Sequence, residues 1–276
     1  MPLPFPQRFR ALARERSPLC VGVDPSAESL KAWGLSDDVS GLRAFCERLV
    51  AVAAPLVAVM KPQAAFFERH GPEGMAVLRD TVAAIQRRGT LALIDVKSGD
   101  IGSTVIAYGD AYLGPNSAYR GDAMTLSPYL GLAALGPIFD RARSAGGGVF
   151  VVVRSSNPEG GALQRAMMAD GRSVAEQLAD DIAAANGSEI GPIGAVVGAT
   201  LGAEAGALAA RMPNALLLVP GIGAQGATIA DVRRDFGPHY ARVIPSVSRG
   251  IARAGPDPAA LRKAVERYLA EPLAAT

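Results

Sequence analysis

Two aspartates flank one lysine in the segment DVKSGD, residues 95–100, and the lysine is the unusual residue. Only four of the 28 basic residues are lysines, and lysine can release a proton near neutral pH whereas arginine cannot. If the chain stays extended through Lys97, the side chains of Asp95 and Lys97 share a face, because alternate residues of a strand point the same way. Two carboxylates, Asp95 and Asp100, near one ammonium raise its pKa and keep it charged. The segment therefore predicts a proton donor, Lys97, beside carboxylates that repel a substrate carboxylate and favour its loss.

Two other interpretations of this segment stay open. The charged groups could form a salt-bridged cluster that only fixes the loop. Alternatively, Asp95 and Asp100 could bind Mg²⁺, since hard cations take carboxylate oxygens. Sites built on several histidines are disfavoured, because the chain has only His70 and His239 and both stand next to turn-forming residues.

A glycine-rich segment, VPGIGAQG at 219–226, follows an apolar run and precedes a helical pattern. Residues 221–226 match the GxGxxG dinucleotide fingerprint, but the acidic residue expected about 20 residues later is missing and the motif lies too late in the chain. The glycines instead let backbone N–H groups approach an anion. Arginine offers a forked cation for the same anion, and glutamine an amide donor. We predict a phosphate site formed by Pro220, Gly221, Gly223, Gln225, Arg249 and Gly250.

Eight short apolar runs alternate with longer stretches at helical period. The runs are continuously apolar, as expected for parallel strands covered on both faces. Eight strand–helix units in about 250 residues predict an α/β fold, the (β/α)8 TIM barrel, rather than an open doubly wound sheet. The predicted strands are 19–24, 56–61, 90–95, 121–126, 148–153, 193–198, 215–219 and 242–247, and the predicted helices include 40–53, 73–88, 173–185, 203–211, 227–235 and 257–269.

Polar residues stand at the ends of these runs, where barrel enzymes build their active sites. The first predicted strand ends at Asp24, the second at Lys61 and the third at Asp95, and the fifth is followed by RSSN at 154–157. Each alone could be a helix cap, but their convergence on one rim indicates a site.

The chain shows no composition break that would divide it. We therefore expect one domain over residues 1–276, with a lead-in helix near 7–16. The long stretch 155–171 after the fifth strand is predicted to be a lid or a binding loop.

The composition narrows the classes of function. With 28 lysines and arginines against 26 aspartates and glutamates, the net charge of +2 disfavours a nucleic-acid binder. The longest uncharged apolar run, residues 49–60, contains Pro55 and is too short for a transmembrane helix, and the N-terminal segment lacks the apolar core of a secretory signal. Two cysteines, Cys20 and Cys46, exclude a disulfide framework and favour the reducing cytoplasm.

Together these motifs resemble the orotidine 5'-phosphate decarboxylase family, and the likeness spans nearly the whole chain. The stretch LIDVKSGDIGST at 93–104 is similar to the family's DxKxxD-I-x-x-T signature. The chain is most similar to the longer bacterial subgroup. Five further segments agree with the family in order and spacing: VGVDPS at 21–26, MKPQAAFFE at 60–68, VVVRSSNPEG at 151–160, VPGIGAQG at 219–226 and SRG at 248–250.

The resemblance implies removal of the C6 carboxylate of orotidine 5'-phosphate to give UMP and CO2, with neither a metal nor an organic cofactor. Lys97 then protonates C6, and Asp95 lies near the departing carboxylate. Lys61 completes the charge network, and Asp24 holds ribose hydroxyls.

The resemblance also assigns binding roles and a partner. Ser156 contacts the pyrimidine edge, and Gln225 and Arg249 grip the phosphate with nearby backbone N–H groups. Asp100 and Thr104 reach the neighbouring subunit's site, which implies a homodimer.

Three positions depart from the family pattern. Ser98 stands where the bacterial subgroup often has arginine, and Leu201-Gly202 stands where a proline-bearing turn is common. Ser127-Pro128 replaces an Asn-Pro or histidine type, so we assign no ligand contact there.

Two other functions are carried forward. A Mg²⁺-dependent sugar-phosphate decarboxylase or aldolase of the same barrel superfamily would share the Asp-Lys-Asp pattern, and metal dependence separates it. A sensor that binds a nucleotide phosphate without turnover would need no proton donor, so Lys97 between two aspartates speaks against it.

Overall fold

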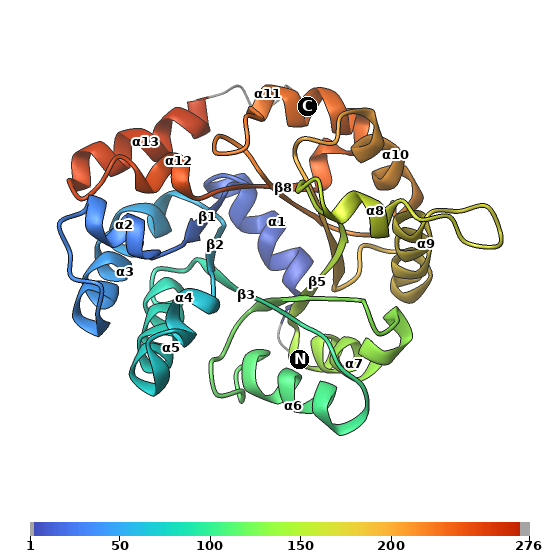
Figure 1. Cartoon of the computed structure of the whole chain (residues 1–276), viewed down its shortest axis with the longest axis horizontal. Helices are drawn as coiled ribbons and strands as arrows, with labels where there is room; N and C mark the ends of the chain where they lie inside the picture. The colour runs from blue at the N-terminus through green and yellow to red at the C-terminus, as the bar shows by residue number, and fades with distance from the viewer. Residues whose placement is uncertain (1–2, 271–276) are drawn as a thin grey trace.

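Eight parallel strands pair in chain order, and the last pairs with the first to close a barrel (Figure 1). The computed structural model describes residues 3–270, so the ends of the predicted 1–276 domain lie outside the described residues. The (β/α)8 barrel predicted from the sequence is confirmed. The strands are β1 (Cys20–Val23), β2 (Val59–Pro62), β3 (Leu91–Ser98), β4 (Ala123–Leu126), β5 (Gly148–Arg154), β6 (Ile193–Val197), β7 (Leu217–Pro220) and β8 (Val243–Val247).

Two strand boundaries differ from the prediction by three residues, and the others differ by two or fewer. The second strand starts at Val59 and not at residue 56, because Pro55 lies in the first turn of a 3-10 helix, η1 (Ala54–Leu56). The third strand runs three residues past Asp95, to Ser98. Its pairing with β4 shifts register between Ile94 and Ser98, so the end of β3 is irregular.

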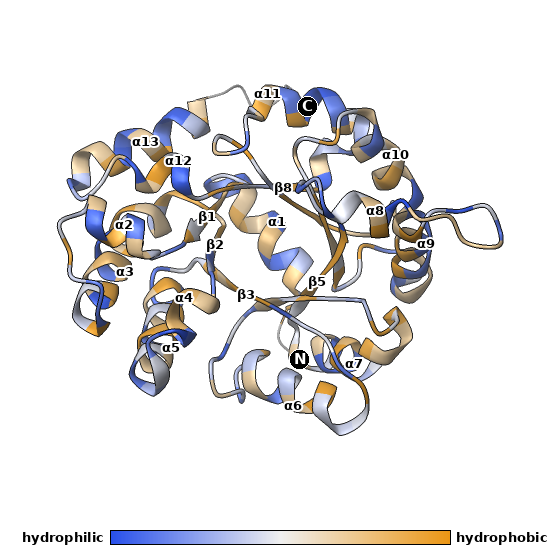
Figure 2. Ribbon diagram, in the orientation of Figure 1, coloured by the Kyte–Doolittle hydropathy of each residue, from blue (hydrophilic) through white to orange (hydrophobic). Residues whose placement is uncertain are grey.

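Helices surround the barrel and face it with their apolar sides (Figure 2). Several begin with side-chain caps, such as the reciprocal capping boxes of Ser173 with Glu176 and of Thr228 with Asp231. The larger outer helices are α3 (Val39–Ala53), α5 (Gly71–Gln86), α6 (Gly102–Tyr112), α7 (Gly136–Ala145), α9 (Val174–Asn186), α10 (Ala203–Arg211), α11 (Ile229–Phe236) and α13 (Pro258–Ala270). The short ones are α2 (Ala27–Ala32), α4 (Ala65–Glu68), α8 (Gly160–Gln164) and α12 (Arg249–Ala252), and two more 3-10 helices are η2 (Leu132–Leu135) and η3 (Gly237–Arg242). None of the helices within residues 3–270 is long and apolar enough to cross a membrane.

The predicted lead-in helix, α1 (Phe5–Glu15), lies across the barrel in Figure 1. Its Phe5 and Phe9 join the cluster of buried side chains that fills the lumen. Phe5 meets Phe150 of β5 edge-to-face, with ring centroids 5.7 Å apart. Since α1 packs against the lumen residues, the chain's polar strand ends are left at the opposite mouth.

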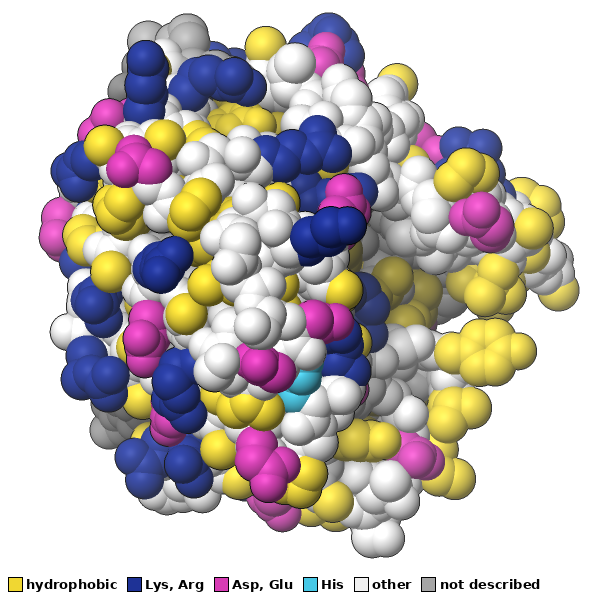
Figure 3. All heavy atoms as spheres, turned by 60° about the vertical axis from the view of Figure 1, so that its left-hand side comes forward, with side chains coloured by type: hydrophobic (Ala, Val, Ile, Leu, Met, Phe, Trp, Pro, Cys, Tyr) yellow, Lys and Arg dark blue, Asp and Glu magenta, His cyan; other side chains and the backbone are white. Residues whose placement is uncertain are grey.

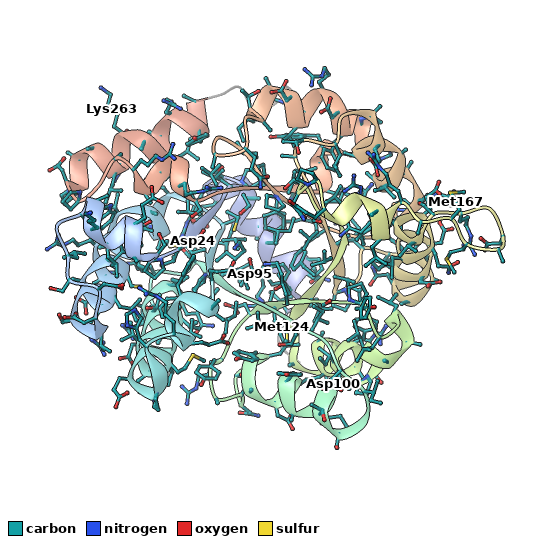
Figure 4. The ribbon with its side chains drawn as sticks, viewed as in Figure 1. Asp24, Asp95, Asp100, Met124, Met167 and Lys263 are labelled. Carbon is teal, nitrogen blue, oxygen red and sulfur yellow. The ribbon has the colours of Figure 1, made fainter. Side chains whose placement is uncertain are left out.

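The stretch 155–171 after β5 is more ordered than its composition indicates. It contains α8, and Met167 pairs with Ser173 in an isolated antiparallel bridge. The resulting hairpin projects from the molecule beside α9, with Met167 at its outer part (Figures 1 and 4). Its role as a lid stays a prediction.

Candidate active site

A cavity of about 290 Å³ lies at the carboxyl ends of the strands. This volume is close to the lower end of the roughly 300–1,000 Å³ typical of small-molecule sites. Nine of the predicted site residues line it: Asp24, Lys61, Asp95, Lys97, Ser156, Pro220, Gly221, Gln225 and Arg249. The other four, Asp100, Thr104, Gly223 and Gly250, are outside this lining.

One carboxylate at the base of the cavity binds two ammonium groups. Lys61 Nζ donates to Asp95 Oδ2 and Lys97 Nζ donates to Asp95 Oδ1, each at 2.6 Å. Burial alone would raise the pKa of Asp95, but the two lysines outweigh it and hold this pKa well below the usual range. Burial likewise would lower the pKa of Lys61, but the Asp95 and Asp24 carboxylates outweigh it and raise this pKa. Asp95 and Lys61 are therefore both charged at neutral pH.

This arrangement corrects the expectation that two carboxylates of the segment 95–100 flank one ammonium. Within one chain the reverse holds, because Asp95 is shared by two lysines. The side chain of Asp100 instead accepts a hydrogen bond from the backbone N–H of Ile101, and Figure 4 places Asp100 beside α6, away from Asp95. The Ser-Gly turn after Lys97 carries Asp100 outward.

The backbone at Lys97 is unusual, since its φ of 49° lies in the left-handed region. Its backbone N–H donates to Thr125 Oγ1 at 2.9 Å, and Thr125 Oγ1 donates to Asp95 Oδ1 at 2.8 Å. Because of the irregular end of β3, Asp95 and Lys97 meet through a left-handed turn and not through a regular strand.

Asp24 at the end of β1 has one satisfied and one unsatisfied oxygen. Its Oδ2 accepts from Ser248 Oγ at 2.5 Å. Its Oδ1 is buried and has no hydrogen-bond partner among the described residues. A buried acceptor without a partner is costly, so this oxygen is suited to a hydroxyl donor of a ligand in the cavity.

The residues after β5 are held by a buried arginine. Arg154 Nε donates to Glu204 Oε1 at 2.8 Å, and Gln164 Oε1 accepts from the backbone N–H of Ser155 at 3.0 Å. Arg154 is 5% exposed, and it also donates to Gln164 Oε1 at 3.2 Å. This network of Arg154, Glu204 and Gln164 fixes the base of the loop that carries Ser156.

Ser156 and the glycine-rich loop meet across the cavity. Ser156 Oγ donates to Gln225 Oε1 at 2.5 Å. The loop needs its glycines, since φ is 112° at Gly221 and 76° at Gly223, where other residues would be strained. A Cβ on Gly221 would also lie 2.6 Å from Gln225 Oε1.

The first turn of α12 faces the same loop. Arg249 lines the cavity at the start of this helix. Gly223 and Gly250 both lie against the Tyr268 hydroxyl, and a Cβ on Gly250 would come within 2.3 Å of that oxygen. The far end of α12 is held by Trp33, whose Nε1 donates to the Ala252 carbonyl at 2.8 Å.

Thr104 lies on α6 and is exposed, as part of an outer surface. Large exposed apolar side chains occur on and before α6 and on the segment after β4, among them Ile101 (60% exposed) and Tyr129 (77% exposed). The two segments that carry them meet, because the backbone N–H of Ser127 donates to the Ser98 carbonyl at 2.8 Å. We call the exposed side chains of Ile101, Ile106, Tyr129 and Leu130 the α6 patch. On the face of the molecule drawn in Figure 3, hydrophobic side chains are frequent along the right-hand edge.

Four residues that line the cavity were missed from the sequence: Gln63, Thr125, Ser246 and Ser248. Ser155 and Asn157, which the sequence showed as polar residues after the fifth strand, also line it. Thr125 sits inside an apolar strand and gave no signal, since threonine is a common strand residue.

The magnesium interpretation finds no support in the donor set. Both oxygens of Asp95 accept from ammonium groups, and two positive charges at this carboxylate oppose a cation. The described residues also contain no group of three or more histidine, cysteine or acidic side chains that could hold a metal ion.

Known proteins match this chain along nearly its full length. A family model described as the orotidine 5'-phosphate decarboxylase / HUMPS family matches residues 17–264. A Myxococcus xanthus protein named orotidine 5'-phosphate decarboxylase is 53% identical over 273 residues, covering 98% of this chain and 95% of the relative. A Salinispora tropica protein of the same name is 51% identical over 269 residues, covering 97% and 96%.

Solved structures agree with the sequence matches. A candidate orotidine 5'-phosphate decarboxylase from Streptomyces avermitilis superposes with a TM-score of 0.91 at 49% identity, covering 96% of this chain and 93% of that one. The Leishmania donovani OMP decarboxylase gives a TM-score of 0.80 at 32% identity, covering 97% and 98%.

Proposed function

The chain belongs to the orotidine 5'-phosphate decarboxylase / HUMPS family, and from this premise we propose how its residues act. It catalyses the decarboxylation of orotidine 5'-phosphate to UMP in pyrimidine biosynthesis. Relatives that are 53% and 51% identical in sequence are named for this activity. The observation that carries the assignment of roles is the Asp95 carboxylate shared by Lys61 and Lys97 at the base of the cavity.

In the reaction, the C6 carboxylate of the substrate lies beside Asp95. Repulsion between the two carboxylates is relieved when the bond between C6 and the carboxylate carbon breaks and CO2 leaves. The electron pair stays on C6, and the Lys97 ammonium donates a proton there to give UMP, after which solvent restores the lysine. Lys61 keeps Asp95 charged throughout and so preserves the repulsion. The chemistry is complete without a metal ion or an organic cofactor.

The rest of the substrate occupies the other side of the cavity. Asp24 accepts from a ribose hydroxyl through its unsatisfied Oδ1. Ser156 contacts the pyrimidine edge. The side chains of Gln225 and Arg249 hold the phosphate, together with backbone N–H groups of Gly221, which follows Pro220, and of the start of α12. Gly223 and Gly250 shape this phosphate site from behind. Phosphate binding far from C6 then contributes energy that orients the ring over Lys97.

We further propose a homodimer in which Asp100 and Thr104 enter the neighbouring subunit's site. The proposal is supported by the α6 patch, which leaves large apolar side chains exposed beside these residues. Mixing Lys97→Ala and Asp100→Asn homodimers tests it. If sites are shared, exchanged dimers regain activity because one of their two sites is intact, whereas independent sites would leave the mixture inactive.

The assignment is tested by the ultraviolet absorbance of orotidine 5'-phosphate incubated with the protein and EDTA, beside Lys97→Ala. We expect the wild type alone to remove the orotate band. Activity that required Mg²⁺ and a sugar phosphate would transfer the chain to the related barrel enzymes. Binding of UMP with no turnover under either condition would instead indicate a sensor.

We place the enzyme in the cytoplasm. Its two cysteines are free and buried, and a reducing compartment suits such a chain.

A further inference from the structure

We propose that Thr125 is a positioning residue for the proton transfer, acting through one hydroxyl that fixes both Asp95 and the backbone of Lys97. The inference rests on the proposed role of Lys97 as proton donor. Thr125 lies on β4 and is 1% exposed, and its hydroxyl is both a hydrogen-bond donor and an acceptor. It donates to Asp95 Oδ1 at 2.8 Å and accepts from the Lys97 N–H at 2.9 Å.

The Thr125 hydroxyl stabilises an unusual backbone conformation at Lys97. The Lys97 backbone is left-handed with φ of 49°, and such a conformation persists in a residue other than glycine only where its surroundings hold it. The register of β3 against β4 shifts just there, so the regular ladder does not hold the Lys97 N–H. Thr125 Oγ1 is the acceptor that replaces it.

The lysine side chain has little else to direct it. It is 48% exposed, and its Nζ donates to Asp95 Oδ1, the same oxygen that Thr125 contacts. The direction of Nζ therefore depends on two things, the local backbone and the position of that oxygen. Thr125 sets both, which separates its role from that of a threonine that only packs in a strand.

The test compares Thr125→Val with Thr125→Ser. Valine keeps the shape of threonine but cannot make either hydrogen bond, whereas serine keeps the hydroxyl. We expect valine to lower kcat about 10- to 100-fold, because a small misplacement of a reacting group costs that much. KM should change less than about threefold, and serine should keep kcat within about threefold of the wild type.

A matched control is Thr81→Val. Thr81 is also buried, and its hydroxyl donates to the Val77 carbonyl in α5, away from the cavity. We expect this variant to keep the wild-type kcat even if its melting temperature falls. If Thr125→Val does not fold, Thr125→Ala replaces it, with circular dichroism and UMP affinity as checks of an intact site.

The outcomes separate the inference from the function on which it rests. A wild type that does not decarboxylate orotidine 5'-phosphate would overturn the proposed function. An active wild type with an unchanged kcat in folded Thr125→Val or Thr125→Ala would overturn the inference alone. So would an equal loss of kcat in the valine and serine variants, because the hydroxyl would then not be what matters.

Discussion

The two halves of the cavity are built differently. On the β2–β4 side, Lys61, Asp95 and Thr125 are buried on strands and are joined by hydrogen bonds of 2.6 to 2.8 Å. On the β5–β8 side, Gln225 and Arg249 are exposed and stand on loops or at a helix start. The groups proposed to react are thus held by hydrogen bonds within the chain, whereas those proposed to bind the phosphate are exposed to the cavity. Substitutions on the first side should change kcat and stability, and those on the second side should change KM.

The largest effect should come from Lys97→Ala. Loss of the proposed proton donor should lower kcat by about 10²- to 10⁴-fold, the usual range for a general acid. Initial rates from ultraviolet absorbance measure it. Lys263→Ala on the outer face of α13 is the matched control and should leave kcat unchanged (Figure 4). A Lys97→Ala enzyme with the wild-type kcat would contradict our assignment of the proton transfer to the β2–β4 side of the cavity.

Asp95→Asn should lower the free energy of unfolding of the protein. It leaves the buried ammonium of Lys61 without its carboxylate, and breaking a buried pair costs about 3–5 kcal/mol. Denaturant unfolding of both proteins at pH 7 measures the loss.

The same pair predicts the pH dependence of that loss. The pKa of Asp95 is depressed in the fold, so its contribution is present above the unfolded value of about 3.9 and is lost as pH falls through the folded value. The pKa of Lys61 is raised, so its contribution is full below about 10.4 and is lost as pH rises beyond that value. The difference in stability between wild type and Asp95→Asn should therefore be largest between these limits, and a constant difference at all pH values would contradict the prediction.

On the loop side, Arg249→Ala should mainly raise KM. Hydrogen bonds to charged groups contribute about 1.5–3 kcal/mol, which corresponds to a KM about 10- to 100-fold higher. Arg253→Ala, one turn further along and outside the cavity, is the control. Steady-state kinetics with orotidine, which lacks the phosphate, sharpen the result, because Arg249→Ala should change that reaction little.

The smallest effect is expected for Gln164→Leu. It frees the Ser155 N–H and loosens the loop that carries Ser156, at a cost of about 1 kcal/mol or a KM about fivefold higher. Gln177→Leu on α9 is the control and should leave KM unchanged, because the Gln177 side-chain amide donates to Asp181 of the same helix, away from this loop. If kcat fell by a larger factor than KM rose in Gln164→Leu, the loop that carries Ser156 would act in the reaction like the β2–β4 side of the cavity.

The sequence predicted the barrel because apolar runs and helical stretches alternate with little interruption. It also predicted the cavity residues at the strand ends, since parallel strands bring their carboxyl ends together. It could not predict the turn at Lys97, because a left-handed lysine depends on a register shift and on an acceptor 28 residues away. For the same reason Thr125 was missed and Asp100 was expected beside Lys97: these contacts are set by long-range packing.

The packing of Trp33 against α12 has a practical consequence. Trp33 is the chain's single tryptophan, it is 4% exposed, and it is bonded to the carbonyl that ends the helix beginning with Arg249. The tryptophan fluorescence of the protein therefore comes from one place, next to the proposed phosphate site. Any shift of α12 on ligand binding alters the environment of the indole, so its emission can follow phosphate binding without an added label.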